Sequence, residues 1–339
     1  MSLPKVSVVI LNWNGKQHLE EFLPTVYNSQ YENLEIVVGD NASTDDSVKF
    51  VKDNFPLIKI IENHENLGYA GGYNAVLKQV EADYYVLLNS DVEVPPYWIN
   101  PVIELMESDN QIAIAQPKIK SFFQRDYFEY AGAAGGFIDK FGYPFCRGRI
   151  FDSLEKDNGQ YNDIQEIFWA SGCALFIKSL AWKRLGGLDA NFFAHMEEID
   201  ICWRAKNLGL KVMYCGLSEV YHVGGGTLNT ESPHKTYLNF RNNAFLLKKN
   251  LSPIRTSFVI PFRFFLDFLA LLRFAFKRQF ANAGAVSKAH RAVCMAFLKR
   301  KINYNKDISN HPNKTGLYQK SIVWDYFVKK KKEFKDLEF

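Results

Sequence analysis

Residues 84–94 read YYVLLNSDVEV, and this stretch decides the fold class and points to the ligand site. Its first five residues are apolar or aromatic, which is typical of a short buried β-strand. The run then stops at Asn89, Ser90 and Asp91, and the residues that follow do not begin a helix. A buried strand that ends on an acid delivers that acid to one edge of a sheet.

Three similar apolar runs precede it: VSVVIL (6–11), LEIVVGD (34–40) and IKII (58–61). Each is followed by a polar loop and by apolar residues at helical spacing, which indicates right-handed βαβ units and a mostly parallel sheet flanked by helices. In such sheets, ligands bind beyond the carboxyl ends of the strands. We therefore predict an α/β fold with a ligand crevice where acids and amides follow the strands: Asp40, Asn41, Asp45, Asn66, Asn74 and Asp91.

The residue types at these strand ends favour a metal-bound diphosphate. Carboxylate and amide oxygens are hard ligands that suit Mg²⁺ or Mn²⁺ bridging to a diphosphate. No G-x-G-x-x-G follows the first strand and no G-x-x-x-x-G-K-[ST] occurs, which argues against dinucleotide oxidoreductases and P-loop enzymes. Ser43 and Asp45 have an alternative role as helix caps. Asp91 precedes VEVPP, where capping is less natural, so we favour a ligand role for it.

Composition indicates a globular protein without a nucleic-acid partner. Of 339 residues, 47% are apolar and 23% are charged, and the net charge of +4 is too small to argue for nucleic acid. Five cysteines are scattered and never spaced as C-x-x-C, which favours reduced thiols in the cytoplasm over disulfides or a zinc site. The first apolar run is expected to be a strand, and no signal-peptide pattern is visible.

Eight motifs occur together, in one order, over Lys5 to Leu247: VSVVILNWNG, VVGDNASTDDS, ENLGYAGGYNAV, LLNSDVEV, WASGCALFIK, FFAHMEEIDICWRAKNLG, VYHVGGGT and YLNFRNN. In these motifs the chain resembles family 2 glycosyltransferases with the GT-A fold, especially their rhamnosyltransferase-like branch. The resemblance implies a catalytic domain over residues 1–250, with a donor half to about 115 and an acceptor half to about 250. Residues 251–339 would form a helical C-terminal extension.

The resemblance also implies where the nucleotide-diphosphate donor binds. It assigns the donor to Asn12, Asn14, Asp40, Asn41, Asn66, Gly68, Asn74, Asn89, Ser90, Asp91 and Arg241. Asn89 and Asp91 stand at the family's metal-binding D-x-D, with Asn in place of the first Asp, so Asp91 would be the principal ligand of Mg²⁺ or Mn²⁺. His222 matches a position that completes the metal shell; the alternative is a packing histidine. Arg241 would hold the diphosphate or simply pair with an acid.

The motif MEEIDICWRAK matches the family's catalytic acids. Members usually have Glu-Asp at Glu197 and Glu198, and the second acid is the expected general base, which takes the proton of the attacking hydroxyl. The change from Asp to Glu leaves the base open between Glu198, which we favour, and Glu197, with Asp200 as a supporting acid. The acceptor side would include Trp169, Ser171 and Gly172, although an isolated Trp is more often a core residue.

These features together predict a metal-dependent inverting glycosyltransferase of cell-surface polysaccharide synthesis. The donor would be a nucleotide-diphosphate sugar, with deoxythymidine-diphosphate rhamnose as one candidate and UDP-galactose or UDP-glucose as alternatives. The acceptor would be a glycan or a lipid-linked molecule.

Two alternative functions are a non-catalytic nucleotide-sugar-binding subunit and a nucleotidyltransferase. Retention of Asp91 and the acid pair argues against the first, and the missing Gly-rich phosphate loop argues against the second.

The C-terminal region contains an apolar segment that suggests contact with a membrane. FVIPFRFFLDFLALLRFAF (258–276) is apolar but contains Arg263, Asp267 and Arg273, and each central charge costs about 2.5–3.5 kcal/mol in a spanning helix. We therefore expect an amphipathic helix at the membrane surface, with basic flanks drawn to anionic lipid, at the inner face of the plasma membrane. The alternative is a helical lid or oligomer interface packed on the catalytic domain.

Overall fold

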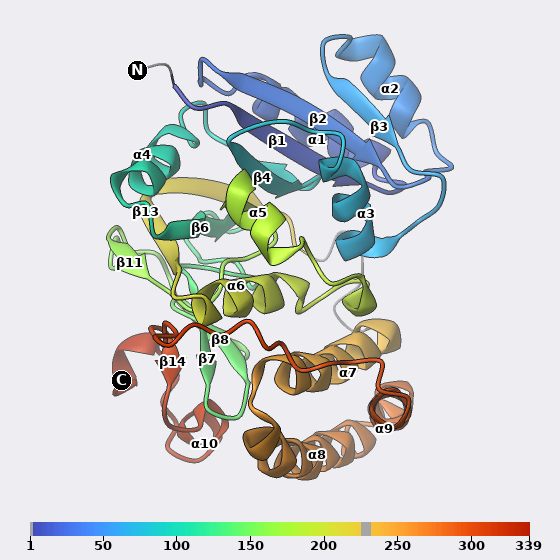
Figure 1. Cartoon of the computed structure of the whole chain (residues 1–339), viewed down its shortest axis with the longest axis vertical. Coiled ribbons are helices and arrows are strands. Elements are labelled where there is room, and N and C mark those ends of the chain that lie inside the picture. The colour runs from blue at the N-terminus through green and yellow to red at the C-terminus, as the bar shows by residue number, and fades with distance from the viewer. Residues whose placement is uncertain (1–2, 225–231) are drawn as a thin grey trace.

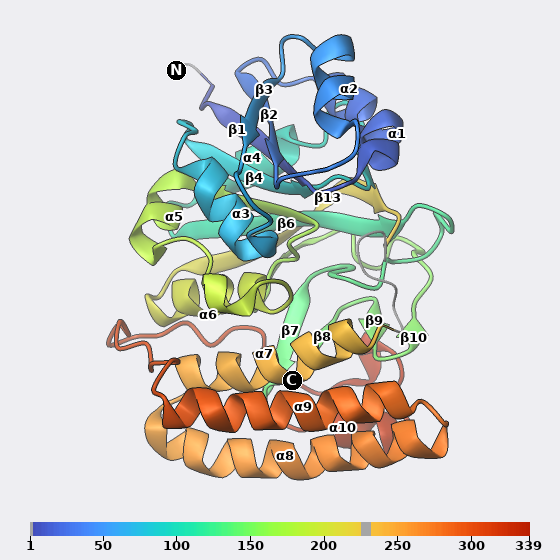
Figure 2. The same ribbon diagram turned by 90° about the vertical axis from the view of Figure 1, so that its right-hand side faces the viewer.

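The computed structural model describes residues 3–224 and 232–339. A central sheet lies between two sets of helices, a smaller sheet adjoins it, and three long helices form a layer at the base (Figures 1 and 2). Part of the motif VYHVGGGT, residues 225–227, lies outside the described residues.

Within the described residues, nine strands form the central sheet, in the order β11-β13-β6-β12-β4-β1-β2-β3, with β5 paired to β13. They are β1 (Val6–Asn12), β2 (Leu34–Asp40), β3 (Lys59–Glu62), β4 (Tyr84–Asn89), β5 (Val92–Glu93), β6 (Ile112–Ser121), β11 (Ile164–Glu166), β12 (Ala174–Lys178) and β13 (Lys211–His222). Strands β1 to β4 are parallel, and β12 runs antiparallel between β4 and β6. The predicted α/β fold with a mostly parallel sheet is confirmed.

Helices cover both faces of this sheet: α1 (Lys16–Tyr27), α2 (Ser47–Asn54), α3 (Gly68–Leu77), α4 (Asn100–Ser108), α5 (Ser179–Leu185) and α6 (Glu197–Asn207), with a 3-10 turn η1 (Ala190–Phe192) before α6. Apolar residues at a spacing of three and four place one face of α1 in the core, where Leu19, Phe22, Leu23 and Val26 are buried. The same periodicity had predicted this helix.

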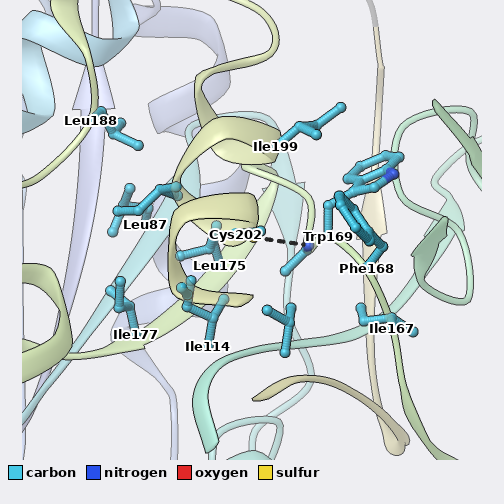
Figure 3. Close-up of a cluster of buried hydrophobic side chains, with 14 of the residues drawn as sticks. Leu87, Ile114, Ile167, Phe168, Trp169, Leu175, Ile177, Leu188, Ile199 and Cys202 are labelled. Carbon is cyan, nitrogen blue, oxygen red and sulfur yellow. Dashed lines mark hydrogen bonds between the residues drawn. The ribbon is translucent and has the colours of Figure 1, made fainter. Parts of the chain in front are cut away.

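Helix α6 is fixed to the sheet by a cluster of buried apolar side chains (Figure 3). Leu87, Leu175 and Ile177 come from the strands, and Ile199 and Cys202 come from α6. The Cys202 sulfur also accepts a hydrogen bond from the Ala170 backbone N–H at 3.3 Å. This packing sets the position of the α6 N-terminus, which carries the acid pair.

A second sheet was not predicted. Its order is β10-β9-β8-β7-β14, from β7 (Gly136–Asp139), β8 (Pro144–Cys146), β9 (Arg149–Ile150), β10 (Ser153–Leu154) and β14 (Leu317–Tyr318). No strand was expected here, because strands of two to four residues are too short to show a periodic pattern. The strand β14 pairs with β7 from far along the chain, which no local pattern encodes.

The C-terminal part of the chain is helical at first and irregular later. Helices α7 (Pro233–Asn250), α8 (Pro253–Phe276) and α9 (Phe280–Leu298) pack together in one layer (Figure 2). Beyond Leu298 the chain is mostly irregular, apart from β14, α10 (Ile322–Phe327) and a 3-10 turn η2 (Phe334–Asp336). This segment returns to the smaller sheet, where Phe334 lies 4.8 Å from Phe137 between ring centres. Within residues 3–224 and 232–339, no helix is long and apolar enough to span a bilayer.

Hydrogen bonds to the buried carboxylate of Asp200 connect α6 with the end of α7. Asp200 has no exposed surface and accepts hydrogen bonds from Arg204 Nε at 2.8 Å, Lys249 Nζ at 2.9 Å and Asn250 Nδ2 at 2.9 Å. Lys249 also pairs with Asp189 at 2.8 Å, in the loop before α6. Both Asp200 oxygens are occupied by these donors. The structure thus gives Asp200 a role in packing, in place of the predicted support of the acceptor.

We expect Asp200→Asn to lower the free energy of unfolding by about 3–5 kcal/mol, because it leaves the buried Arg204 and the half-buried Lys249 without their common partner. Chemical denaturation followed by circular dichroism measures this loss. Asp53→Asn, at an exposed position on α2, is the matched control and should change stability by less than about 0.5 kcal/mol. Equal stability of the two variants would show that the Asp200 contacts do not hold α6 on α7.

Candidate active site

The carboxyl ends of β1, β2 and β4 lie side by side. Asn12 is in register with Asp40, and Leu11 with Asn89, so predicted residues from three strands line one edge. The Asn12 amide donates to Asp40 Oδ1 at 3.2 Å and to Ser43 Oγ at 3.1 Å. Its Oδ1 atom is buried and has no hydrogen-bond partner among the described residues. An unpaired buried acceptor at a strand end is suited to receive a donor group from a ligand.

The loops after β1 and β2 are joined by Asn14. Its backbone has a φ of 50°, in the left-handed region that Asn tolerates. Its side-chain oxygen accepts from the Thr44 N–H at 2.7 Å, and its own N–H donates to Ser43 Oγ at 2.9 Å. Ser43, Thr44 and Asp45 therefore bind the neighbouring loop as well as turning the chain into α2. Ser90 lies next to this group, near Gly15.

Asn41, Asn66 and Gly68 form a second polar group at the same edge. The Asn41 amide donates to Asn66 Oδ1 at 2.9 Å and to the Gly68 carbonyl at 3.1 Å. Gly68 has a φ of 70°, and a Cβ atom there would lie 2.5 Å from the ring of Phe193. The close approach that requires glycine is thus to a protein side chain. The family resemblance instead assigns Gly68 to the donor site, and that assignment stays a prediction.

Asn74 is separated from this group. Its amide donates to the Leu188 carbonyl at 2.6 Å, and its oxygen accepts from the Leu188 N–H at 3.0 Å. Both polar ends of the side chain therefore hold the loop before α6, so Asn74 positions this loop. It also lines a cavity of about 530 Å³ between the α5–α6 loop and residues 303–307.

Asp91 and His222 meet at the end of the crevice. The pairing of Val92 with His222 brings the turn after β4 against the end of β13, and the Val223 N–H donates to the Asp91 carbonyl at 3.1 Å. His222 Nε2 lies 3.2 Å from Asp91 Oδ1 and 3.4 Å from Asn89 Nδ2. Both residues are buried. Burial alone would raise the pKa of Asp91, but the charge of His222 holds this pKa below its ordinary value.

Glu129 was missed by the sequence analysis. Its carboxylate lies 3.4 Å from His222 Nδ1, on the other side of the ring from Asp91, and it is 7% exposed. Burial acts to raise the pKa of Glu129, yet the hydrogen bond and charge of His222 lower it overall, so Glu129 is ionised. A single glutamate before a Gly-rich loop carries no recognisable pattern, and only the folded chain reveals it as the second neighbour of His222.

The donor set fits a cation that also binds phosphate. No group of three or more His, Cys, Asp or Glu arranged to hold a metal occurs in the part of the chain that the structure describes. Asp91 and His222 nevertheless form a buried pair of ligand types, and Mg²⁺ is commonly held by one or two protein groups with substrate phosphates and water. The residues present therefore fit a divalent metal that binds together with a diphosphate.

The acid pair lies at the N-terminus of α6. Burial raises the pKa of Glu197 well above its ordinary range, and the charge of Glu198 raises it further. Loss of water around the carboxyl raises the pKa of Glu198 to about 7, although backbone N–H groups of the first helical turn oppose the shift. One buried oxygen of each acid has no hydrogen-bond partner among the described residues. Both acids therefore bind a proton more readily than ordinary glutamates do, and Glu198 can gain or lose its proton near pH 7.

The turn before α6 is strained. Phe193, His195 and Met196 have φ values of 66°, 69° and 76°, which non-glycine residues seldom adopt and which often mark functional sites. The amide of Asn242 on α7 holds this turn by donating to the carbonyls of Phe192, Ala194 and His195, at 2.8–2.9 Å. Asn242 was not singled out from the sequence.

Arg241 and Trp169 donate hydrogen bonds to backbone carbonyls of the protein. Arg241 donates to the carbonyls of Asn191 at 3.1 Å and Phe192 at 2.9 Å, so it supports the strained turn and has no contact with the Asp91 group. Trp169 is 6% exposed, and its indole N–H donates to the Phe137 carbonyl at 2.8 Å (Figure 3). Its position is that of a core residue, the alternative that the sequence left open.

Ser171 and Gly172 lie closer to the crevice. The Ser171 hydroxyl donates to the Ala131 carbonyl at 2.8 Å, two residues from Glu129. The Gly172 carbonyl accepts from the Tyr69 hydroxyl at 2.7 Å, and the charges of Glu197 and Glu198 help to raise the pKa of Tyr69 beyond the effect of burial. Tyr69 therefore holds the segment before β12 and lies near enough to the acid pair to be affected by its charge.

Two known proteins are similar to parts of this chain. An uncharacterized glycosyltransferase of Haemophilus influenzae is 32% identical over 112 residues, which cover 32% of this chain and 35% of that protein. The N-acetylglucosaminyl-diphospho-decaprenol L-rhamnosyltransferase of Mycobacterium tuberculosis is 23% identical over 233 residues, 63% of this chain and 75% of that protein. The chain thus spans about a third of the first relative and three quarters of the second.

Among solved structures, the mannosyltransferase of Pyrobaculum calidifontis in complex with GDP-mannose and Mn²⁺ is similar, with a TM-score of 0.52 and 16% identity. The match covers 88% of this chain and 76% of that one. It shows that the fold is GT-A. Residues 7–185 match the sequence profile of Glycosyl transferase family 2, and this match includes Asp40 and Asp91. Because it spans more than half of the 339 residues, the chain belongs to Glycosyl transferase family 2.

Proposed function

We propose that the protein transfers a sugar from a nucleotide-diphosphate donor to a lipid-linked or glycan acceptor, with inversion at the anomeric carbon, in polysaccharide synthesis. One observation carries the proposal. The chain holds a buried pair of metal-ligand types, Asp91 and His222, 3.2 Å apart, and an acid pair at the start of α6, Glu197 and Glu198, each with one buried oxygen that has no hydrogen-bond partner among the described residues. The Tyr69 hydroxyl donates to the Gly172 carbonyl at 2.7 Å, and the charges of Glu197 and Glu198 act with burial to raise the pKa of Tyr69, which supports a position of the acid pair near this segment.

The donor half supports binding of the nucleotide diphosphate. Asn12, Asn14 and Asp40 present polar atoms at the strand ends, where a base and ribose would lie. Asp91 and His222 would hold Mg²⁺ or Mn²⁺, which would neutralise charge on the leaving diphosphate. The GT-A neighbour with bound Mn²⁺ and GDP-mannose is consistent with this proposal.

The acceptor half supports a general base. In a single displacement, the acceptor hydroxyl attacks the anomeric carbon and loses its proton, and the bond to the diphosphate breaks on the opposite face. Glu198 takes that proton, because its pKa of about 7 lets it be ionised at neutral pH. Glu197 is less suited to act as the base, because burial and the charge of Glu198 favour its protonated form.

The donor sugar and acceptor are proposed by similarity. The mycobacterial relative is named as a rhamnosyltransferase that acts on a lipid diphosphate, so rhamnose and a polyprenyl-linked acceptor are our first choice. Release of nucleotide diphosphate, measured across a panel of dTDP-, UDP- and GDP-sugars with Mg²⁺ or Mn²⁺, tests it. The alternative is a nucleotide-sugar-binding subunit without catalysis. Tight donor binding with no turnover on any acceptor fraction would favour that alternative.

We expect Asp91→Asn to abolish metal-dependent binding of the nucleotide diphosphate, because an amide is a far weaker cation ligand than a carboxylate. Titration calorimetry with and without Mn²⁺ measures the effect, and a thermal unfolding curve checks the fold. Asp109→Asn, which removes a partly exposed acid paired with Lys211, is the matched control. Metal-dependent binding that survives in Asp91→Asn would exclude Asp91 as a ligand.

Glu198→Gln keeps the size of the side chain but cannot accept a proton. We expect kcat to fall by roughly 10²- to 10⁴-fold with little change in donor affinity. Glu197→Gln should have the smaller effect on kcat, since burial and the charge of Glu198 favour the protonated form of Glu197. The reverse order of the two variants would move the base to Glu197.

The pH profile provides a separate check on the base. Glu198 must be ionised to act, so kcat should fall about tenfold per pH unit below pH 7 and level off above it. The residual activity of Glu198→Gln should lack this acidic limb. A wild-type profile that stays flat from pH 5 to 8 would contradict the assignment.

A further inference from the structure

The outer surface of α8 carries a continuous stripe of large apolar side chains. These residues are 41–86% exposed: Ile254, Phe258, Phe262, Phe265, Phe268, Leu269 and Phe276. They recur at spacings of three, four and seven residues, which places them on one face of a helix. From the first to the last, the stripe is about 33 Å long. In Figure 2 this helix is the outermost element at the base of the molecule.

The two central charges of α8 point away from this stripe. Arg263 and Asp267 are 6% and 4% exposed and lie 3.7 Å apart. Asp267 also contacts His290 of α9 at 3.0 Å, and the Arg263 guanidinium lies 3.6 Å from the ring centre of Tyr143. These are the charges that argue against a spanning helix. In the folded protein they anchor α8 to its neighbours and leave the outer stripe apolar.

Helix α10 extends the apolar surface. Trp324, Phe327 and Val328 are 57%, 38% and 52% exposed. The guanidinium of Arg273 lies 5.7 Å from the ring centre of Phe327, so the C-terminal end of α8 adjoins α10. Both helices lie at the lower edge of the molecule in Figures 1 and 2. We call the outer stripe of α8 together with these three residues the base surface.

The base surface is large and its border is mostly basic, with one exposed acid, Asp152, 3.8 Å from Arg273. At about 200 Å² for a fully exposed side chain of this size, the α8 stripe alone exposes on the order of 900 Å². The largest apolar patch on a typical monomer is about 300–600 Å². The exposed charged residues of α8 and of the turn after it are all positive: Arg255, Arg273, Lys277 and Arg278. Lys329 and Lys330 follow α10 and are also exposed.

We propose that the base surface docks on a bilayer that contains anionic lipid, with α8 parallel to the membrane plane. Apolar side chains at the centre of such a helix enter the headgroup boundary, while basic residues at the border contact lipid phosphates. A second copy of the chain fits less well, because a symmetric contact would bring two borders of the same sign together. Strands β1 to β3 lie at the opposite end of the molecule (Figure 1), so the donor half would face water. This inference is independent of the donor and of the catalytic residues.

Sedimentation of the full-length protein with vesicles tests the proposal. We expect binding to phosphatidylcholine vesicles that contain phosphatidylglycerol at low salt, and partial release at high salt, where charges are screened but the apolar contact is not. Phe258→Gln, Phe265→Gln and Phe276→Gln combined should weaken binding at least about 100-fold. The matched control combines Leu57→Gln, Leu180→Gln and Leu217→Gln, at equally exposed leucines of other segments. It should bind like wild type.

The basic border is tested separately. Arg255→Gln with Lys277→Gln should weaken binding to anionic vesicles by about 30-fold, since each contact is worth about 1 kcal/mol. Lys49→Gln with Lys78→Gln, in the donor half, should have no effect. Light scattering at the same concentrations reports the oligomeric state. The proposal is overturned if wild type ignores anionic vesicles at low salt, if the leucine control loses binding equally, or if the phenylalanine variant only separates a dimer.

Discussion

The parallel alignment of β1, β2 and β4 is the constraint on which the candidate site depends. Their backbone register pairs Asn12 with Asp40 and Leu11 with Asn89, so the polar residues that end each strand meet at one edge. Strand β13 joins the same sheet through β6, and its far end brings His222 against Asp91. A shift of any of these strands by one residue would turn the site residues to the other face.

A second constraint fixes the acid pair opposite these strand ends. Helix α6 begins after a turn in which Phe193, His195 and Met196 have positive φ values. Such backbone conformations persist only where surrounding contacts stabilise them. The carbonyls of this turn are bound by Asn242 and Arg241 of α7, and Asp200 ties α6 to the end of α7. Arg241 and Asp200, which resemble donor and acceptor contacts in the sequence, bind segments next to the acid pair. The helical layer therefore supports the part of the chain that carries Glu197 and Glu198.

Local patterns could identify part of the site. Acids and amides directly after apolar strands were recognised because the strand itself predicts where its end will lie, as for Asp40 and Asp91. Glu129, Asn242 and Tyr69 were missed because each lies in a segment without such a pattern and acquires its neighbours only in the folded chain. Asn74, Arg241 and Trp169 were singled out from motifs, but their polar atoms are already bound by backbone groups.

The sequence by itself determined the α/β class, the strands that bear the donor residues, the acid pair at the start of α6 and an amphipathic helix in the tail. Each of these features follows from the composition and the residue spacing of one continuous segment. The tertiary structure alone decided that the tail returns to pair β14 with β7, that Glu129 and Asp91 flank His222, and that the charges of α8 face inward. Each depends on contacts between residues far apart in the chain, and such contacts leave no periodic signal in either partner.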